Sequence, residues 1–242
     1  SRTLAPLAQI ANLFGRANNA KTSYKRLASF MKETEDDDVS RKNESAIRRE
    51  KLGSLEFKDT IYRYPEADLD TLRGINIKIN EGEKIAILGR NGSGKSTLMK
   101  LASGLFKATD GLVLYDGVDI KQLHTKDLSR SIGIVLQDVQ LFSGTVRENI
   151  TMGREDISQG DLIEAGKLSG LDEFISKIPG GYDLQLLDGG KGLSGGQRQA
   201  IALTRAIVHK PSHFILDEPT SAMDMNAENL FINQVEKILK DS

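Results

Sequence analysis

The 242-residue sequence contains no cysteine, no tryptophan and only three histidines. The lack of cysteine excludes disulfides, thiolate metal sites and a cysteine nucleophile. His124, His209 and His213 do not follow the spacing of a metal-ligand set. Any chemistry of this chain therefore depends on other residue types.

An excess of charge of either sign is also missing. The 33 Lys and Arg residues nearly cancel the 34 Asp and Glu residues, which leaves a net charge of -1. A bulk electrostatic attraction to nucleic acid is therefore not expected. No apolar run approaches the roughly 20 residues that span a bilayer, and no secretory signal opens the chain. As given, the chain is expected to be soluble, and its 38% of apolar residues allow a sizeable core.

The first 51 residues differ from the rest. Apolar residues recur at helical spacing between residues 1 and 32 and predict a helix: Leu4, Leu7, Ala11, Phe14, Tyr24, Leu27 and Met31. This helix is either an ordinary amphipathic helix or the end of a longer helix that begins upstream. Residues 33–51 are almost wholly polar and densely charged, which predicts a solvated linker.

From Leu52 onward the pattern is that of a globular domain. Alternating or apolar segments predict strands at residues 54–64, 74–80, 85–89, 111–117, 130–138 and 213–219. The segment "IAILG" (85–89) is apolar throughout, which is typical of a strand buried on both faces. Residues 96–105 and most of 146–208 are expected to be helical. Strands interleaved with helices predict an α/β fold with a largely parallel core sheet.

The first glycine-rich segment fits the pattern G-x-x-x-x-G-K-[ST]. Its loop amides and the N-terminus of the next helix suit phosphate oxygens. Lys95 supplies a positive charge, and the Ser96 hydroxyl can bind Mg²⁺. The segment therefore predicts a nucleoside triphosphate site formed by Gly89, Arg90, Asn91, Gly92, Ser93, Gly94, Lys95, Ser96 and Thr97.

Hydrolysis needs acids as well, and "HFILDEP" supplies two at the end of a predicted strand. Asp217 is expected to hold Mg²⁺. Glu218 is expected to orient or deprotonate the attacking water. Adjacent acids at a strand end also occur as helix caps, and this alternative remains open.

A second glycine-rich segment, "LSGGQ" (193–197), precedes another predicted helix. The Ser194 hydroxyl, the amides of Gly195 and Gly196, and the helix N-terminus with Gln197 form a further anion site. The phosphate loop, this segment and the Asp-Glu strand, in this order, resemble the nucleotide-binding domain of ABC transporters over residues 53–242.

The resemblance implies a P-loop NTPase core with a mostly parallel sheet, an antiparallel β subdomain (about 53–85) and an α-helical signature subdomain (about 140–205). ATP and Mg²⁺ are the implied ligands. Two such domains are expected to pair head to tail, with each ATP between the phosphate loop of one copy and the "LSGGQ" of the other. The implied domain division is 1–51, the end of a membrane-domain helix and its linker, and 52–242, the ATPase domain.

Further residues match the family's motifs. Tyr64 stands where the family stacks an aromatic ring on adenine, although a buried strand tyrosine is the simpler alternative. Gln137 matches the Gln loop, which contacts Mg²⁺ and the attacking water, so it is counted with Lys95 and Glu218 as catalytic and with Ser96 and Asp217 as metal-binding. The segment "SAMD" matches the loop that crosses the dimer interface, with Ser221, Ala222 and Asp224.

The segment "LFSGTVRENI" (141–150) resembles the exporter branch, and the first 31 residues are similar to those of bacterial type I secretion permease/ATPases. That similarity implies protein export from the cytoplasmic face of the bacterial inner membrane. The implied partners are a membrane-spanning domain, a second ATPase domain, a membrane-fusion adaptor and an outer-membrane channel, with no nucleic acid. Two alternatives remain open: an exporter of peptides, lipids or drugs, and a soluble ABC ATPase acting on nucleic acid or ribosomes.

One departure from the family concerns the switch histidine that contacts the γ-phosphate. No histidine follows His213. The switch histidine and its strand are therefore expected to lie beyond Ser242.

Overall fold

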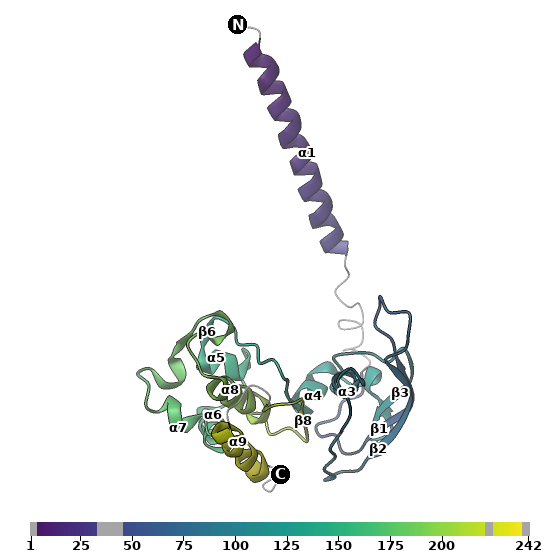
Figure 1. Cartoon of the computed structure of the whole chain (residues 1–242), viewed down its shortest axis with the longest axis vertical. Coiled ribbons are helices and arrows are strands. Elements are labelled where there is room, and N and C mark those ends of the chain that lie inside the picture. Colours follow the sequence, from purple (N-terminus) through teal and green to yellow (C-terminus); the bar gives the residue numbers. More distant parts are fainter. Residues whose placement is uncertain (1–3, 33–45, 221–224, 239–242) are drawn as a thin grey trace. The chain divides into compact units, whose positions relative to one another are not determined.

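The computed structural model describes residues 4–32, 46–220 and 225–238, in two units, Ser1–Ser45 and Ala46–Ser242 (Figure 1). In the first unit, helix α1 (Leu4–Lys32) confirms the predicted helix. Its Tyr24 and Leu27 side chains are 72% and 64% exposed. No helix of the described residues is both long and apolar enough to cross a membrane.

In the second unit, one part is an antiparallel sheet in the order β2-β1-β3-β4. Strand β1 (Leu55–Tyr62) lies between β2 (Leu72–Ile79) and β3 (Asp110–Tyr115), and β3 continues into β4 (Val118–Asp119). In this register Leu55 is opposite both Ile79 and Tyr115. The alternation predicted for residues 54–64, 74–80 and 111–117 is thus confirmed as three paired strands.

Helix α3 (Lys95–Ala102) shares a hydrophobic core with this sheet. Leu101 and Tyr115 are completely buried. The Tyr115 hydroxyl donates to the carbonyl oxygen of Ala102 at 2.8 Å, and burial raises the pKa of Tyr115. The helix that begins at the phosphate loop is therefore anchored to β3 at its other end.

A parallel pair lies beyond this sheet in the chain order. Strand β5 (Ile132–Val135) follows α4 (Thr125–Ser131) and pairs with β8 (His213–Leu216), with Ile132 opposite His213. Because parallel strands end at the same edge, β5 leads to Gln137 and β8 leads to Asp217 on one side. This pair brings together residues that are 81 positions apart in the sequence, such as Ile132 and His213.

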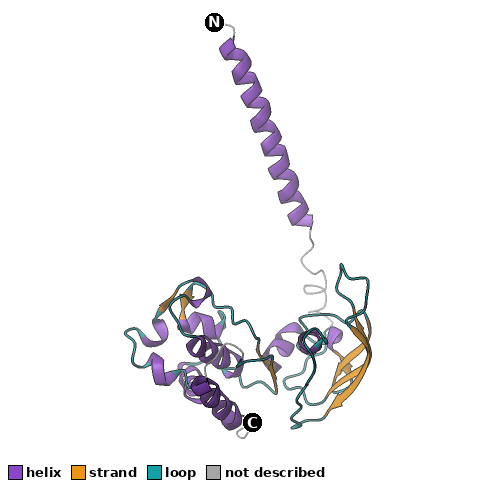
Figure 2. Cartoon of the chain, viewed as in Figure 1, coloured by secondary structure: helices purple, strands orange, loops and turns teal. Residues whose placement is uncertain are grey.

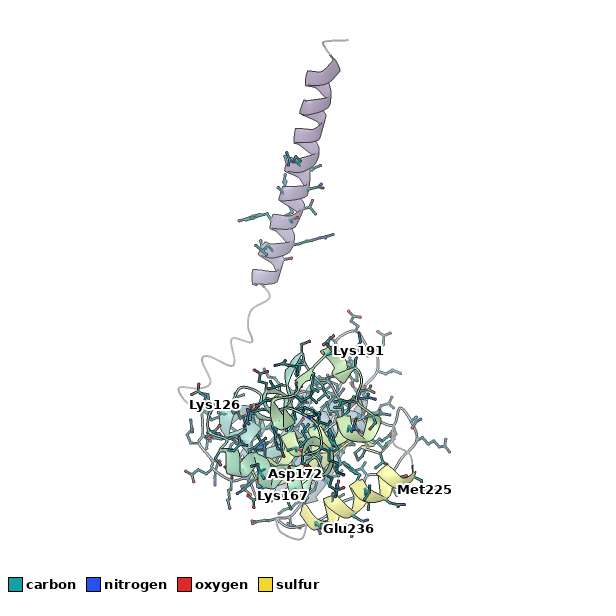
Figure 3. The ribbon with its side chains drawn as sticks, turned by 90° about the vertical axis from the view of Figure 1, so that its left-hand side faces the viewer. Lys126, Lys167, Asp172, Lys191, Met225 and Glu236 are labelled. Carbon is teal, nitrogen blue, oxygen red and sulfur yellow. The ribbon has the colours of Figure 1, made fainter. Side chains whose placement is uncertain are left out.

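The rest of the second unit is largely helical, as predicted for residues 146–208, and has its own hydrophobic core (Figure 2). Figure 3 labels Met225 and Glu236 near the two ends of its last helix. The elements are β6 (Gly144–Thr145), α5 (Val146–Thr151), α6 (Gln159–Leu168), α7 (Asp172–Ile175), β7 (Gln185–Leu186), α8 (Gly195–Ile207), α9 (Met225–Ile238) and the 3₁₀ turns η2 (Gly181–Asp183) and η3 (Asp188–Gly190). The 3₁₀ turn η1 (Ile120–Gln122) follows β4, and its Ile120 belongs to the core of the antiparallel sheet.

The strand predicted at residues 85–89 is wrong. This segment pairs with no strand in the part of the chain that the structure describes, and Ile85, Ile87 and Leu88 are 45%, 39% and 91% exposed. An apolar run favours burial, but a strand also needs a neighbour for its backbone amides and carbonyls. The α/β class with antiparallel and parallel sheets is nevertheless confirmed, and in the described residues the parallel part comprises β5 and β8.

Leu203 on α8 tests the helical core. Its side chain is completely buried beside other core residues such as Leu162, whereas Leu187 is 65% exposed. Leu203→Ala is expected to lower the free energy of unfolding by about 2–5 kcal/mol, because it removes buried contacts and leaves a cavity. Leu187→Ala, the matched control, should change it by less than about 0.5 kcal/mol. Urea unfolding of both variants measures this, and equal effects would contradict the assignment of the core.

Candidate nucleotide site

The phosphate loop requires glycine at two positions. Gly92 and Gly94 have φ angles of 79° and 91°, in the left-handed region that side chains disfavour. Gly94 is also the N-cap of α3, and a Cβ there would lie 2.7 Å from Cδ2 of Leu72. The loop can therefore turn sharply into α3 and present its backbone to a ligand.

Lys95, the first residue of α3, folds back over this loop. Its Nζ donates to the carbonyl oxygens of Gly89 at 3.1 Å and Arg90 at 3.3 Å. It also lies 3.7 Å from Oε1 of Glu218, and its side chain is only 14% exposed. The positive charge is thus held at the mouth of the loop, where phosphate oxygens would replace the carbonyl oxygens as its partners.

Asp217 is buried directly after β8. Its residue exposure is 5%, and its backbone amide donates to the carbonyl oxygen of Val135 at 2.9 Å. Its Oδ1 atom has no hydrogen-bond partner among the described residues. A buried carboxylate oxygen without a hydrogen-bond partner costs folding free energy unless a cation neutralises its charge. This residue type and environment fit Mg²⁺, whose preferred protein ligands are oxygens.

Glu218 has a strained backbone. Its φ angle is 43°, in the region that costs a non-glycine residue free energy. Oε2 accepts a hydrogen bond from Nε2 of Gln137 at 3.3 Å, and Oε1 faces Lys95. The structure thus brings Lys95, Gln137 and Glu218 together from three separate segments. A carboxylate held between a lysine and an amide, 44% exposed, is accessible to a water molecule.

Tyr64 follows β1 and lies beside α3. Its hydroxyl is 3.1 Å from Oγ1 of Thr97, in the first turn of that helix. The residue is 37% exposed, whereas Tyr62 within the strand is 7% exposed. The alternative of a buried strand tyrosine therefore describes Tyr62, and the Tyr64 ring is available to a ligand bound at the loop.

The second glycine-rich segment begins α8 through a capping box. The Ser194 hydroxyl accepts a hydrogen bond from the backbone amide of Gln197 at 3.2 Å. Oε1 of the Gln197 side chain accepts one from the backbone amide of Ser194 at 2.9 Å. The Arg198 guanidinium donates to the carbonyl oxygen of Leu193 at 2.7 Å and so fixes the residue that precedes Ser194. Helix α8 packs with α5 and α6, while α3 packs with the antiparallel sheet (Figure 1). Ser221, Ala222 and Asp224, the predicted interface residues, lie outside the described residues.

Two polar residues escaped the sequence analysis: Asn149 is buried and Arg205 is half-buried. Asn149, 2% exposed, donates to the carbonyl oxygens of Phe142 and Thr145 and accepts from the Phe142 amide. Arg205 on α8 donates to the carbonyl oxygens of Asn149 at 2.7 Å and Gln140 at 3.1 Å. Together they join the signature helix to the segment that follows Gln137. The arginine inside the apolar run "AIALTRAIV" was the available signal.

Comparisons with a family model, with curated proteins and with solved structures agree on one family. The family model described as ABC transporter matches residues 72–221. The chain is 38% identical over 225 residues to the "Cyclolysin secretion/processing ATP-binding protein CyaB" of Bordetella pertussis, which covers 93% of this chain and 31% of that protein. It is also 38% identical over 198 residues to the "Putative multidrug export ATP-binding/permease protein YgaD" of Bacillus subtilis, which covers 81% and 34%.

A solved structure of a bacterial Atm1-family ABC exporter with ATP bound has a TM-score of 0.73 and 31% sequence identity. That match covers 80% of this chain and 34% of the exporter chain. The chain thus spans about a third of the length of the curated relatives it matches. It belongs to the ABC transporter family, as an ATP-binding domain of the exporter type.

Proposed function

We propose that this domain hydrolyses ATP with the residues that meet at the carboxyl ends of β5 and β8. The position of Glu218 carries the proposal, because its carboxylate lies 3.7 Å from Nζ of Lys95 and 3.3 Å from Nε2 of Gln137. Lys95 and the loop from Gly89 to Thr97 bind the phosphates. Glu218 activates the attacking water, and Gln137 orients that water.

The metal in this proposal is Mg²⁺. Ser96, Gln137 and Asp217 would hold it. The unpartnered Oδ1 of Asp217 supports this role. When bound, Mg²⁺ neutralises charge that develops on the phosphate oxygens. Tyr64 stacks on the adenine, as its partial exposure beside the loop allows.

The second part of the proposal is a head-to-tail dimer. Ser194, Gly195, Gly196 and Gln197 at the start of α8 contact the ATP held by a second copy. Their capping box supports this role, because it preorganises a helix N-terminus that suits an anion. Ser221, Ala222 and Asp224 lie at the same dimer interface.

For the whole transporter we propose protein export by type I secretion. The Bordetella pertussis relative is named as a secretion protein, and its name supports the proposal of protein export. The partners are a membrane-spanning domain of the same protein, a membrane-fusion adaptor and an outer-membrane channel, with the ATPase at the cytoplasmic face of the inner membrane.

The multidrug relative, at the same identity, favours drug export as the second candidate. Comparing the secreted proteins of the source cells with those of cells that carry Lys95→Ala separates these candidates, since a drug exporter would leave them unchanged.

Lys95→Ala tests the nucleotide site directly. In the proposed site the Lys95 ammonium group donates charge-assisted hydrogen bonds to the phosphates. Their loss should weaken ATP·Mg²⁺ binding by about 10- to 100-fold. Isothermal titration of the variant and the parent measures this. Lys84→Ala, an exposed lysine before the loop, is the matched control and should bind like the parent. Equal affinity of Lys95→Ala and parent would contradict the site.

A further inference from the structure

Three aromatic rings from two separate segments form a cluster beside the phosphate loop. Tyr62 and Phe106 stack with their ring centroids 5.2 Å apart and their planes 7° apart. Tyr64 stands edge-on to both, with centroids at 5.1 Å from Tyr62 and 5.7 Å from Phe106. Tyr62 is 7% exposed and Tyr64 is 37% exposed. The first two rings therefore form a fixed base on which the more exposed ring of Tyr64 rests.

The hydroxyl of Tyr64 fixes the other end of its ring. It lies 3.1 Å from Oγ1 of Thr97, which is 5% exposed in the first turn of α3. Thr97 is two residues after Lys95, so the phosphate-binding helix itself orients the tyrosine. A ring held at its edge and at its hydroxyl has little freedom to lose when a ligand stacks on it.

Phe106 is attached to the same helix at its other end. Its backbone amide donates to the carbonyl oxygen of Lys100 at 3.1 Å. The ammonium group of Lys100 also lies 5.2 Å from the centroid of the Phe106 ring. Two of the three supports of Tyr64, namely Thr97 and Phe106, thus belong to α3 or to the segment that follows it, whereas the third, Tyr62, belongs to β1.

We propose that Phe106 is a positioning residue for base recognition. It holds the Tyr64 ring at the angle at which the adenine of ATP stacks, and it ties this ring to the helix that binds the phosphates. The inference rests on the proposed function, in which Tyr64 stacks on adenine. Because Phe106 acts through the Tyr64 ring, its effect is expected on the base half of the nucleotide.

Binding of two probes separates this role from a structural one. ATP·Mg²⁺ carries the base, and inorganic tripolyphosphate·Mg²⁺ carries only the phosphates. Phe106→Leu keeps an apolar side chain but removes the ring, and it should weaken ATP binding by about 3- to 10-fold, the effect of one lost aromatic pair. Tripolyphosphate binding should stay within about twofold of the parent, since Lys95 and the loop are intact.

Two variants serve as controls. Phe106→Tyr keeps the aromatic ring and should bind ATP with the affinity of the parent. Leu105→Ala alters the neighbouring residue, which is 59% exposed, so both probes should bind as they do to the parent. Circular dichroism of each variant confirms that the fold is retained.

Tyr64→Leu distinguishes failure of the inference from failure of the site. If it weakens ATP binding while Phe106→Leu does not, Tyr64 keeps its role and the positioning role of Phe106 is wrong. If Tyr64→Leu leaves ATP binding unchanged, adenine stacking by Tyr64 is wrong, and the inference about Phe106 fails with it. Equal weakening of ATP and tripolyphosphate by Phe106→Leu would also overturn the inference, because the ring would then support α3 as a whole.

Discussion

Replacing Glu218 by glutamine is expected to slow ATP hydrolysis by about 10²- to 10⁴-fold, the usual contribution of general acid–base catalysis. The amide keeps the size of the side chain and its place beside Gln137, but it cannot accept a proton from water. It also removes the negative charge 3.7 Å from Lys95, so that ATP binding should be retained or tightened. The variant should therefore accumulate as an ATP-bound dimer.

Phosphate release under saturating ATP measures the rate, and size-exclusion chromatography with ATP detects the dimer. Glu66→Gln makes the same chemical change at an exposed acid in the turn between β1 and β2 and serves as the matched control. Turnover of Glu218→Gln equal to that of Glu66→Gln would assign the base role to another residue.

The second large effect concerns the signature segment. Ser194→Arg places a long cation where the neighbouring ATP is proposed to bind and removes the hydroxyl that caps α8. Hydrolysis should fall by about 10²- to 10³-fold, as for other losses of transition-state donors. ATP binding to the isolated domain should be unchanged, because the phosphate loop of the same copy is intact. Ser194→Thr keeps a capping hydroxyl and is the control.

Mixing two inactive variants tests whether the site is shared. A dimer of one Ser194→Arg chain and one Lys95→Ala chain has one site with an intact loop and an intact signature segment. A random mixture should recover roughly a quarter of the parental rate, because half of the dimers are mixed and each has one of two sites. No recovery, with a parental rate strictly proportional to protein concentration at every dilution, would contradict the shared site.

The glycine pattern was sufficient to predict the phosphate loop, because Gly92, Gly94 and Lys95 are read from local spacing alone. Three of the four strands of the antiparallel sheet were likewise predicted from alternating or apolar segments. Residues 85–89 were assigned wrongly because an apolar run does not specify its partner strand. The contacts of Tyr62 and Phe106, 44 residues apart, depend on how α3 returns to the sheet, which no local pattern contains.

The capping box of α8 was only partly visible in the sequence. Ser194 and Gln197 have the spacing of such a box, yet they were interpreted solely as an anion site. Asn149 and Arg205 were missed because their partners are mostly backbone carbonyls, and every residue type has a carbonyl. Side chains that bond to the backbone leave no complementary residue for sequence reasoning to find.

The positive φ angle of Glu218 has a consequence for protein engineering. Glycine adopts this conformation without strain, so Glu218→Gly relieves a backbone penalty of about 1 kcal/mol or more while it abolishes the proposed base. A screen for heat resistance alone would therefore reward loss of turnover at this position. Natural selection on transport favours glutamate at position 218, whereas laboratory selection on thermostability alone favours glycine. A screen that measures both stability and turnover is therefore needed to keep the acid.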